Sequence, residues 1–178
     1  LTVGGGVNSN SDFDVLLKSG ADKVSINSAA VKDPFLIKKA SDKYGSQCVV
    51  LAIDAYKDKN SSSGYSVSVN GGKKRTGIDA LKWAVKGVKY GAGEILLTSM
   101  NSDGTKSGYD IKLTKLISQS VSVPIIASGG AGKPLDMANV VLEGKASAVL
   151  AASIFHYGTH SIQEAKQYLD SKGIPVRI

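Results

Sequence analysis

The stretch PIIASGGAG (residues 124–132) decides the fold, because an aliphatic run that ends in a glycine turn leads directly into a helix-like segment. The segment LTVGGG (residues 1–6) has the same pattern, and GADKVSINS (residues 20–28) resembles GKASAVLAAS (residues 144–153). Glycine turns between a strand and a helix expose backbone N–H groups, which bind phosphate beside a helix N-terminus. The repetition predicts either a substrate with two phosphate ends or a fold built from a duplicated half.

Six short apolar runs alternate with helix-like segments. The expected strands lack strict alternation, which is typical of parallel strands buried on both faces, and they cover residues 1–3, 23–26, 49–53, 94–97, 124–127 and 148–151. Caps and terminal glycines predict helices over residues 13–19, 35–44, 78–90, 111–120, 135–143 and 162–172. Ser11 or Asp12 is the expected cap of the first helix, and Ser161 that of the last. The polar segment 57–75, with its alternating YSVSV run (residues 65–69), predicts an inserted β-hairpin.

Six consecutive βα units favour a (β/α)8 TIM barrel over the alternative, an open doubly wound sheet. Polar residues follow the strands at their carboxyl ends, where barrel active sites lie. We expect residues 1–178 to form a single domain, the last six units and C-terminal three-quarters of such a barrel. The chain begins inside a strand pattern and without Met, so we interpret it as the C-terminal part of a longer protein.

Composition excludes several classes of function. The net charge is +7, but the basic residues are dispersed apart from residues 73–75, and aromatic residues make up only 6% of the chain, which leaves little for stacking on bases. We therefore expect a solvated basic surface that attracts anionic metabolites, with no nucleic-acid or membrane partner. The single cysteine, Cys48, cannot form an internal disulfide and fits a cytoplasmic protein. His156 and His160 are the only histidines and lack further ligands, so we expect no metal.

Several polar residues at strand ends could carry chemistry. Asp54 follows the apolar run 49–53, where partial burial would raise its pKa towards values useful for proton transfer. Asn27, Ser28, Thr98 and Asp103 occupy similar positions and could bind phosphate or sugar hydroxyls. Each of these residues could equally be an ordinary cap or turn residue.

With these residues in hand, the chain resembles one family over almost its whole length. The matching segments are residues 3–6, 20–30, 45–50, 52–55, 91–99, 103–110, 127–132 and 150–156. The family is the cyclase subunit of imidazole glycerol phosphate synthase, a lyase of histidine biosynthesis. The resemblance implies a barrel that needs no cofactor. Ammonia from a glutaminase subunit, separate or fused, would cross its core and attack a bis-phosphorylated phosphoribulosyl-formimino-aminoimidazole carboxamide ribotide. The products would be imidazole glycerol phosphate and aminoimidazole carboxamide ribotide.

The resemblance also implies roles for individual residues. Asp54 matches one of two aspartates that act as general acid and base. One phosphate site matches Gly5, Gly6, Asn27 and Ser28. The other matches Gly104, Ser128, Gly129, Gly130 and Ser153, while Asp103 and Thr98 line the cavity between them. Charged residues that gate ammonia match Lys23 and Glu94, and the face that meets the glutaminase matches Asp22 and Gln47.

Two positions depart from the family pattern, and two other functions stay open. Asn101 replaces a common acid, which would weaken substrate contacts, and Lys145 replaces a common glycine, which we interpret as surface drift. The matching segment would lack the first two βα units and the other catalytic aspartate, so we expect it to be inactive alone. The alternatives are a non-catalytic phosphosugar- or partner-binding barrel fragment and the sister isomerase of the same pathway.

Overall fold

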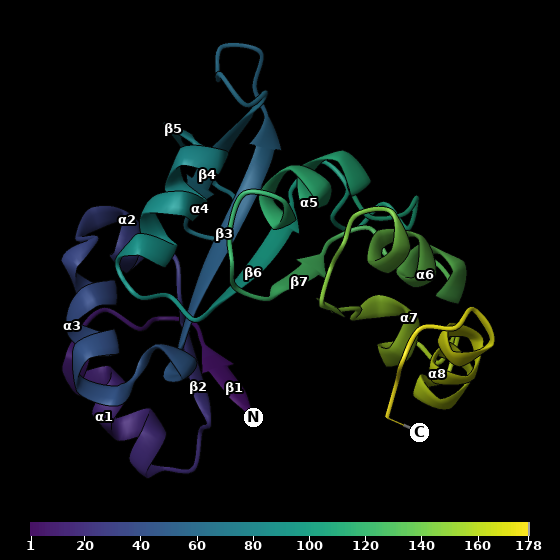
Figure 1. The fold of residues 1–178 in the computed structure, drawn as a ribbon, viewed down its shortest axis with the longest axis horizontal. Helices are drawn as coiled ribbons and strands as arrows, with labels where there is room; N and C mark the ends of the chain where they lie inside the picture. Colours follow the sequence, from purple (N-terminus) through teal and green to yellow (C-terminus); the bar gives the residue numbers. More distant parts are fainter. Residues whose placement is uncertain (178) are drawn as a thin grey trace.

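The computed structural model describes residues 1–177 as a curled parallel sheet with helices along its outer side (Figure 1). The sheet order is β1-β2-β3-β6-β7-β8, and all five of these pairings are parallel. The strands are β1 (Thr2–Gly4), β2 (Lys23–Ile26), β3 (Val49–Lys57), β6 (Glu94–Ser99), β7 (Ile125–Ser128) and β8 (Ala148–Val149). This arrangement confirms the predicted partial (β/α)8 barrel.

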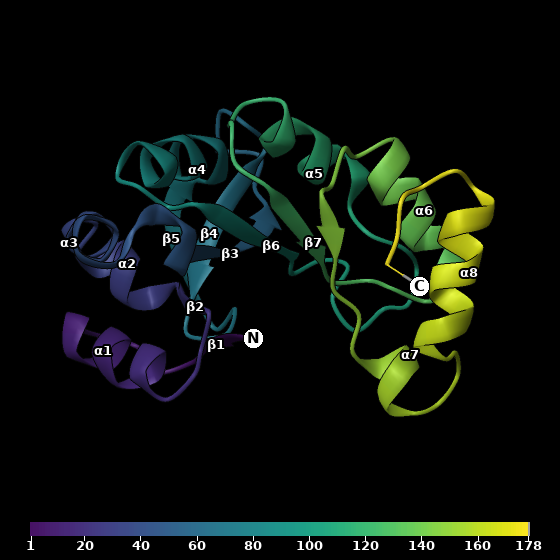
Figure 2. The same ribbon diagram turned by 60° about the horizontal axis from the view of Figure 1, so that its bottom comes forward.

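The helices cover the convex face of the sheet, while the concave face stays open (Figure 2). A doubly wound sheet would carry helices on both faces, so that alternative was wrong. The helices are α1 (Asn10–Lys18), α2 (Ser28–Lys32), α3 (Phe35–Tyr44), α4 (Ala80–Lys89), α5 (Ile111–Ser118), α6 (Pro134–Leu142), α7 (Ser153–His156) and α8 (Ile162–Ser171). A 3₁₀ turn, η1 (Ser46–Cys48), precedes β3. None of the helices within residues 1–177 is long and apolar enough to cross a membrane.

The core lies between the sheet and these helices. Val49, Leu51 and Ile53 of β3 are fully buried, as expected of a central parallel strand with a near-continuous apolar run. Leu51 also explains one small residue, Gly87 of α4, because a Cβ there would lie 2.2 Å from the Leu51 Cδ2. The glycine lets α4 pack closely against the strand that carries Asp54.

Several boundaries differ from the predictions. Helix α1 begins earlier than expected because Ser9, and not Ser11 or Asp12, is its N-cap, and Asp12 completes a capping box from inside the helix. The short helices α2 and α7 were not predicted, since four or five residues are too few to show helical periodicity. Strand β8 ends at Val149, two residues earlier than predicted.

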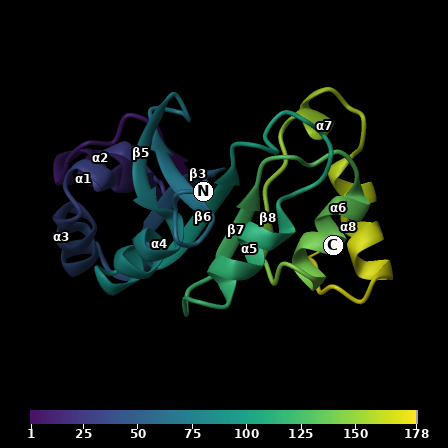
Figure 3. The ribbon, with the colours of Figure 1, turned by 90° about the horizontal axis from the view of Figure 1, so that it is seen from above.

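The inserted hairpin is confirmed and is larger than predicted (Figure 3). Strand β3 continues to Lys57, and this extension pairs antiparallel with β4 (Tyr65–Val69), which pairs in turn with β5 (Lys74–Asp79). We call these three antiparallel segments the ribbon. Residues 78 and 79, which we expected in a helix, belong to β5 because Asp79 is the N-cap of α4.

Asp79 connects the ribbon to α4. Its Oδ1 accepts from the Lys82 backbone N–H (2.9 Å), and its Oδ2 accepts from the Ser61 hydroxyl (2.6 Å) and the Ser63 N–H (2.8 Å). Burial raises the pKa of Asp79, but these hydrogen bonds to the ionised form outweigh burial and hold the pKa well below its ordinary value. The ionised carboxylate therefore stabilises the fold.

Lys145 has a backbone φ of 61°, in the left-handed region where side chains are strained. This conformation lets the Ala146 N–H return to the Val140 carbonyl (3.2 Å) after α6 ends. The left-handed backbone explains why glycine is the common residue at position 145 in the family. The interpretation of Lys145 as simple surface drift was therefore incomplete. The Lys145 side chain is exposed, so the free-energy cost of lysine at this position comes from strain in its backbone.

We expect Asp79→Asn to destabilise the protein by about 1–2 kcal/mol at pH 7, because an amide has a single acceptor oxygen and cannot accept the three hydrogen bonds that link Asp79 to the ribbon and α4 together with a fourth from the Ser62 hydroxyl (2.9 Å). The folded-state pKa is lowered, so this stabilisation is complete above the unfolded value of 3.8 and is lost as pH falls through the lower folded value. Urea unfolding at pH 7 and pH 3 should show the difference between the variant and wild type shrinking in acid. Asp42→Asn, which breaks only an exposed ion pair with Lys38, should have little effect at either pH.

We expect Lys145→Gly to stabilise the protein by about 0.5–1 kcal/mol, because removal of the left-handed strain exceeds the entropy that glycine costs. Lys115→Gly, in the interior of α5, should destabilise by about 1 kcal/mol, since that residue lies in an ordinary helical segment. Thermal and urea unfolding measure both changes. Destabilisation by Lys145→Gly would contradict the assignment.

Candidate active site

A first pocket of about 400 Å³ opens at the carboxyl ends of β1, β2 and β3. It brings together five of the predicted site residues, namely Gly5, Gly6, Asn27, Ser28 and Asp54. Gly5 and Gly6 have positive φ values of 94° and 74°, so the turn after β1 depends on glycine. The unpredicted helix α2 begins at Ser28, which places a helix N-terminus beside the glycine turn. A glycine turn beside the start of a helix is an arrangement that can bind an anion.

A second pocket of about 160 Å³ lies at the carboxyl ends of β7 and β8. It is lined by six of the predicted residues, namely Asp103, Gly104, Ser128, Gly129, Gly130 and Ser153. A Cβ on Gly130 would lie 2.1 Å from the Gly108 carbonyl oxygen, so the loop after β6 packs directly on this turn. Helix α7 begins at Ser153, just as α2 begins at Ser28. The two pockets are thus built in the same way.

One row of residues links the two pockets. Asp54 pairs with Thr98 across β3 and β6, and Thr98 pairs with Ser128 across β6 and β7. Residues in register on neighbouring strands share a face of the sheet, so Thr98 lies between a residue of the first pocket and a residue of the second. The structure therefore places Thr98 between the two pockets.

Two neighbours of Asp54 have opposite effects on its ionised form: Asn27 stabilises it, and the negative charge of Asp103 destabilises it. The Asn27 Nδ2 donates to Asp54 Oδ2 (2.9 Å). Burial raises the pKa of the Asp54 carboxyl, and the negative charge of Asp103 raises it further, while the hydrogen bond from Asn27 opposes both. The Asn27 Oδ1 is buried and has no hydrogen-bond partner among residues 1–177. The pKa of Asp54 is therefore above the ordinary value of an aspartate, in the direction that suits proton transfer near neutral pH.

The first pocket also includes residues that the sequence analysis did not select. Asn70 and Gly71, at the turn between β4 and β5, line it, and the Asn70 N–H donates to the Ser28 hydroxyl (3.0 Å). The sequence predicts a hairpin here but does not show that its tip returns to Ser28. Asn8 in the first pocket and Lys106 in the second were missed for the same reason, since each follows a turn whose path is set by tertiary packing.

Asn101 lines neither pocket and instead makes a structural hydrogen bond. Its Oδ1 accepts from the Lys57 backbone N–H (2.8 Å), where β3 ends. A carboxylate could accept the same hydrogen bond, so the amide preserves it. The lining residues of the two pockets do not include Asn101.

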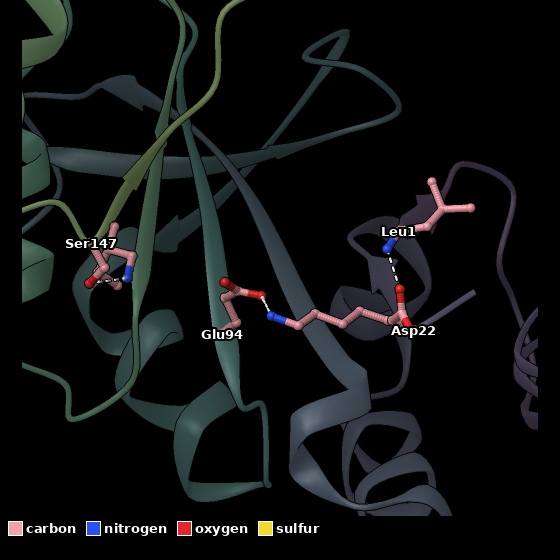
Figure 4. Close-up of polar contacts among 6 residues, drawn as sticks. Leu1, Asp22, Glu94 and Ser147 are labelled. Carbon is pink, nitrogen blue, oxygen red and sulfur yellow. Dashed lines mark hydrogen bonds and ion pairs between the residues drawn. The ribbon is translucent and has the colours of Figure 1, made fainter. Parts of the chain in front are cut away.

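Charged residues gather at the opposite, amino end of the strands. The Lys23 ammonium donates to Glu94 Oε2 (2.6 Å), and the Glu94 side chain is only 14% exposed. Figure 4 shows Glu94 near the start of β6, while Asp22 lies before β2 and contacts the Leu1 amino group. Gln47, in η1 before β3, also belongs to this end. The four residues predicted for ammonia entry and partner contact therefore share the end of the sheet away from Asp54.

The histidines lie apart from this chemistry. His156 is exposed at the end of α7 and packs edge-on against Tyr157, with ring centroids 5.1 Å apart. Within residues 1–177, no group of three or more His, Cys, Asp or Glu side chains could hold a metal ion.

Known proteins resemble this chain over most or all of its length. The family model described as histidine biosynthesis protein matches residues 1–161. The imidazole glycerol phosphate synthase subunits HisF of Dehalococcoides mccartyi strains 195, BAV1 and CBDB1 are 56%, 55% and 54% identical to this chain over all 178 residues. The chain spans 69% of the length of each of these relatives. These matches show that the chain belongs to the histidine biosynthesis protein family, in the group of the imidazole glycerol phosphate synthase subunit HisF.

Proposed function

We propose that this chain carries the cyclase site of imidazole glycerol phosphate synthase, a lyase of histidine biosynthesis. Ammonia attacks the bis-phosphorylated phosphoribulosyl-formimino-aminoimidazole carboxamide ribotide, and cyclisation with cleavage gives imidazole glycerol phosphate and aminoimidazole carboxamide ribotide. The observation that carries the proposal is the position of Asp54 in one of two matched glycine-lined pockets, within a chain 56% identical to a HisF subunit. That identity favours the cyclase over the sister isomerase.

The two pockets suit the two ends of this substrate. Backbone N–H groups at Gly5 and Gly6 hold one phosphate together with Asn27 and Ser28. The turn at Gly129 and Gly130 holds the other, together with the remaining residues of the second pocket. Because Thr98 lies in register between Asp54 and Ser128, a substrate anchored at both ends crosses the Asp54 carboxylate.

Asp54 acts as a general acid or base in this proposal. Its raised pKa brings the carboxyl closer to the pH at which proton transfer is most efficient. The hydrogen bond from Asn27 fixes the orientation of the carboxylate, so that its free oxygen can face the substrate. Asp103, whose charge raises the Asp54 pKa, binds substrate hydroxyls from the neighbouring loop.

Ammonia enters from the amino end of the strands in this proposal. The pair of Lys23 and Glu94 stands at that end and gates the passage towards the pockets. A glutaminase subunit docks there and contacts the exposed Asp22 and the neighbouring Gln47. The gate and the partner face thus lie at the amino end of the sheet, and the phosphate pockets lie at its carboxyl end.

Asp54→Asn should reduce ammonia-dependent turnover of the full protein by about 10²–10⁴-fold, the usual contribution of a general acid or base. Product formation measured with ammonium salts, without the glutaminase, isolates this step. Asp58→Asn removes a carboxylate four residues further on, outside both pockets, and should retain most activity. Undiminished turnover of Asp54→Asn would instead favour a non-catalytic phosphosugar-binding barrel.

The pH profile of kcat/KM provides a second test. If the ionised Asp54 is required, Asp103→Asn should move the acidic limb to lower pH, because the charge that raises the Asp54 pKa is removed. Asn27→Ala should move the limb to higher pH, because a hydrogen bond to the ionised form is lost. Both variants will also lose substrate affinity, so the measured quantity is the position of the limb and not its height. Limbs that do not move would exclude Asp54 as the titrating group.

A further inference from the structure

Arg75 lies in the same row of the ribbon as Asp54. Ser68 of β4 pairs with Asp54 of β3 on one side and with Arg75 of β5 on the other. Because residues in register on adjacent strands share a face, Arg75 is on the face that carries Asp54. The register of β4 and β5 shifts between Ser66 and Ser68, and the pairing of Ser68 with Arg75 is kept.

The Arg75 guanidinium is oriented but has no charged partner. It stacks over the Tyr56 ring, 4.3 Å from the centroid, and the Tyr56 residue beneath it is only 7% exposed. Within residues 1–177, the guanidinium forms neither an ion pair nor a hydrogen bond. Asp58, a nearby carboxylate, instead accepts from the Ser66 hydroxyl (2.7 Å) and the Asn60 N–H (3.0 Å). Stacking fixes the plane of the guanidinium and leaves its N–H edge available.

The lining of the first pocket contains no cationic side chain. Thirteen residues line it and none is Lys or Arg, whereas Lys106 lines the second pocket. A phosphate placed there would lie near the Asp54 carboxylate with only neutral donors to offset the repulsion. The adjoining cavity of about 560 Å³ shares Asn8, Ser28, Ala29 and Asn70 with the first pocket. Arg75, Lys32 and Lys74 line this cavity, and among the described residues Arg75 is the one of these three whose cationic group is held over an aromatic ring. Arg75 therefore lies beside the first pocket, and apart from its stacking on Tyr56 its guanidinium has no ion-pair or hydrogen-bond partner among the described residues.

We propose that Arg75 is a substrate-positioning residue whose guanidinium binds the phosphate group held in the first pocket. A planar guanidinium can donate two parallel hydrogen bonds to phosphate oxygens, which sets the orientation of that end of the substrate above Asp54. The contact is the same in the ground state and the transition state, so it contributes to affinity and not to the chemical step. The assignment rests on the proposed function, since it requires a phosphorylated substrate at this site.

Arg75→Gln in the full protein tests the assignment. We expect KM for the bis-phosphate to rise about tenfold while kcat changes less than about twofold, the pattern of lost uniform binding. Arg75→Lys should recover part of the affinity through its charge, and Arg75→Met, which keeps an apolar cover over Tyr56, should behave like Arg75→Gln. Lys73→Gln is the matched control, because it removes one positive charge from the same hairpin and borders neither pocket nor cavity. Equal KM values for Arg75→Gln and Lys73→Gln would overturn the assignment.

Titration with inorganic phosphate separates this inference from the proposed function. In NMR spectra, the Arg75 Nε–H resonance should shift and saturate together with the Gly5 and Gly6 amides, even in the inactive Asp54→Asn variant. A wild-type protein without turnover, but with this saturating shift, would refute the proposed reaction and support the anion contact. Shifts of Gly5 and Gly6 without any response of Arg75 would refute the contact alone.

Discussion

The pairing of β3 with β6 is the constraint on which the rest of the structure depends. It runs in register over six residue pairs, from Val50 with Glu94 to Ala55 with Ser99. A parallel ladder fixes which residues lie side by side, because a shift of one residue would turn every side chain to the other face. The same ladder therefore sets Glu94 at the amino end of the sheet and Asp54 beside Thr98 at the carboxyl end.

The charged residues at the two ends of the strands differ in whether they are paired. The amino end carries the half-buried pair of Lys23 and Glu94, which satisfies two charges that would be costly to bury alone. At the carboxyl end, no cation within residues 1–177 forms an ion pair with Asp54 or Asp103. Burial, together with the charge of Asp103, raises the Asp54 pKa. One end therefore holds its charges neutralised, while the other keeps a carboxylate available for chemistry.

The ribbon forms hydrogen bonds to residues at or next to each of the two pockets. At its turn, Asn70 donates to Ser28 in the first pocket. At its other end, the Tyr65 hydroxyl donates to Asp110 (3.1 Å), which caps α5 after the loop that lines the second pocket. Burial, with Asp110 beside it, raises the pKa of Tyr65 to about 12, so this hydroxyl stays a donor at neutral pH. An insertion that interrupts the βα alternation thus supports both halves of the site.

The sequence by itself determined the six strands, the glycine turns, and five of the thirteen lining residues of the first pocket and six of the eleven of the second. It could do so because apolar runs and turn glycines are local signals. It did not determine that Asn70 returns to Ser28, that Ser9 caps α1, or that Lys145 needs a left-handed backbone. The orientation of Arg75 over Tyr56 was equally beyond it. These features depend on contacts between residues distant in the chain or on backbone angles imposed by packing. Only the tertiary structure decides them, since the same local residues could adopt other conformations without their neighbours.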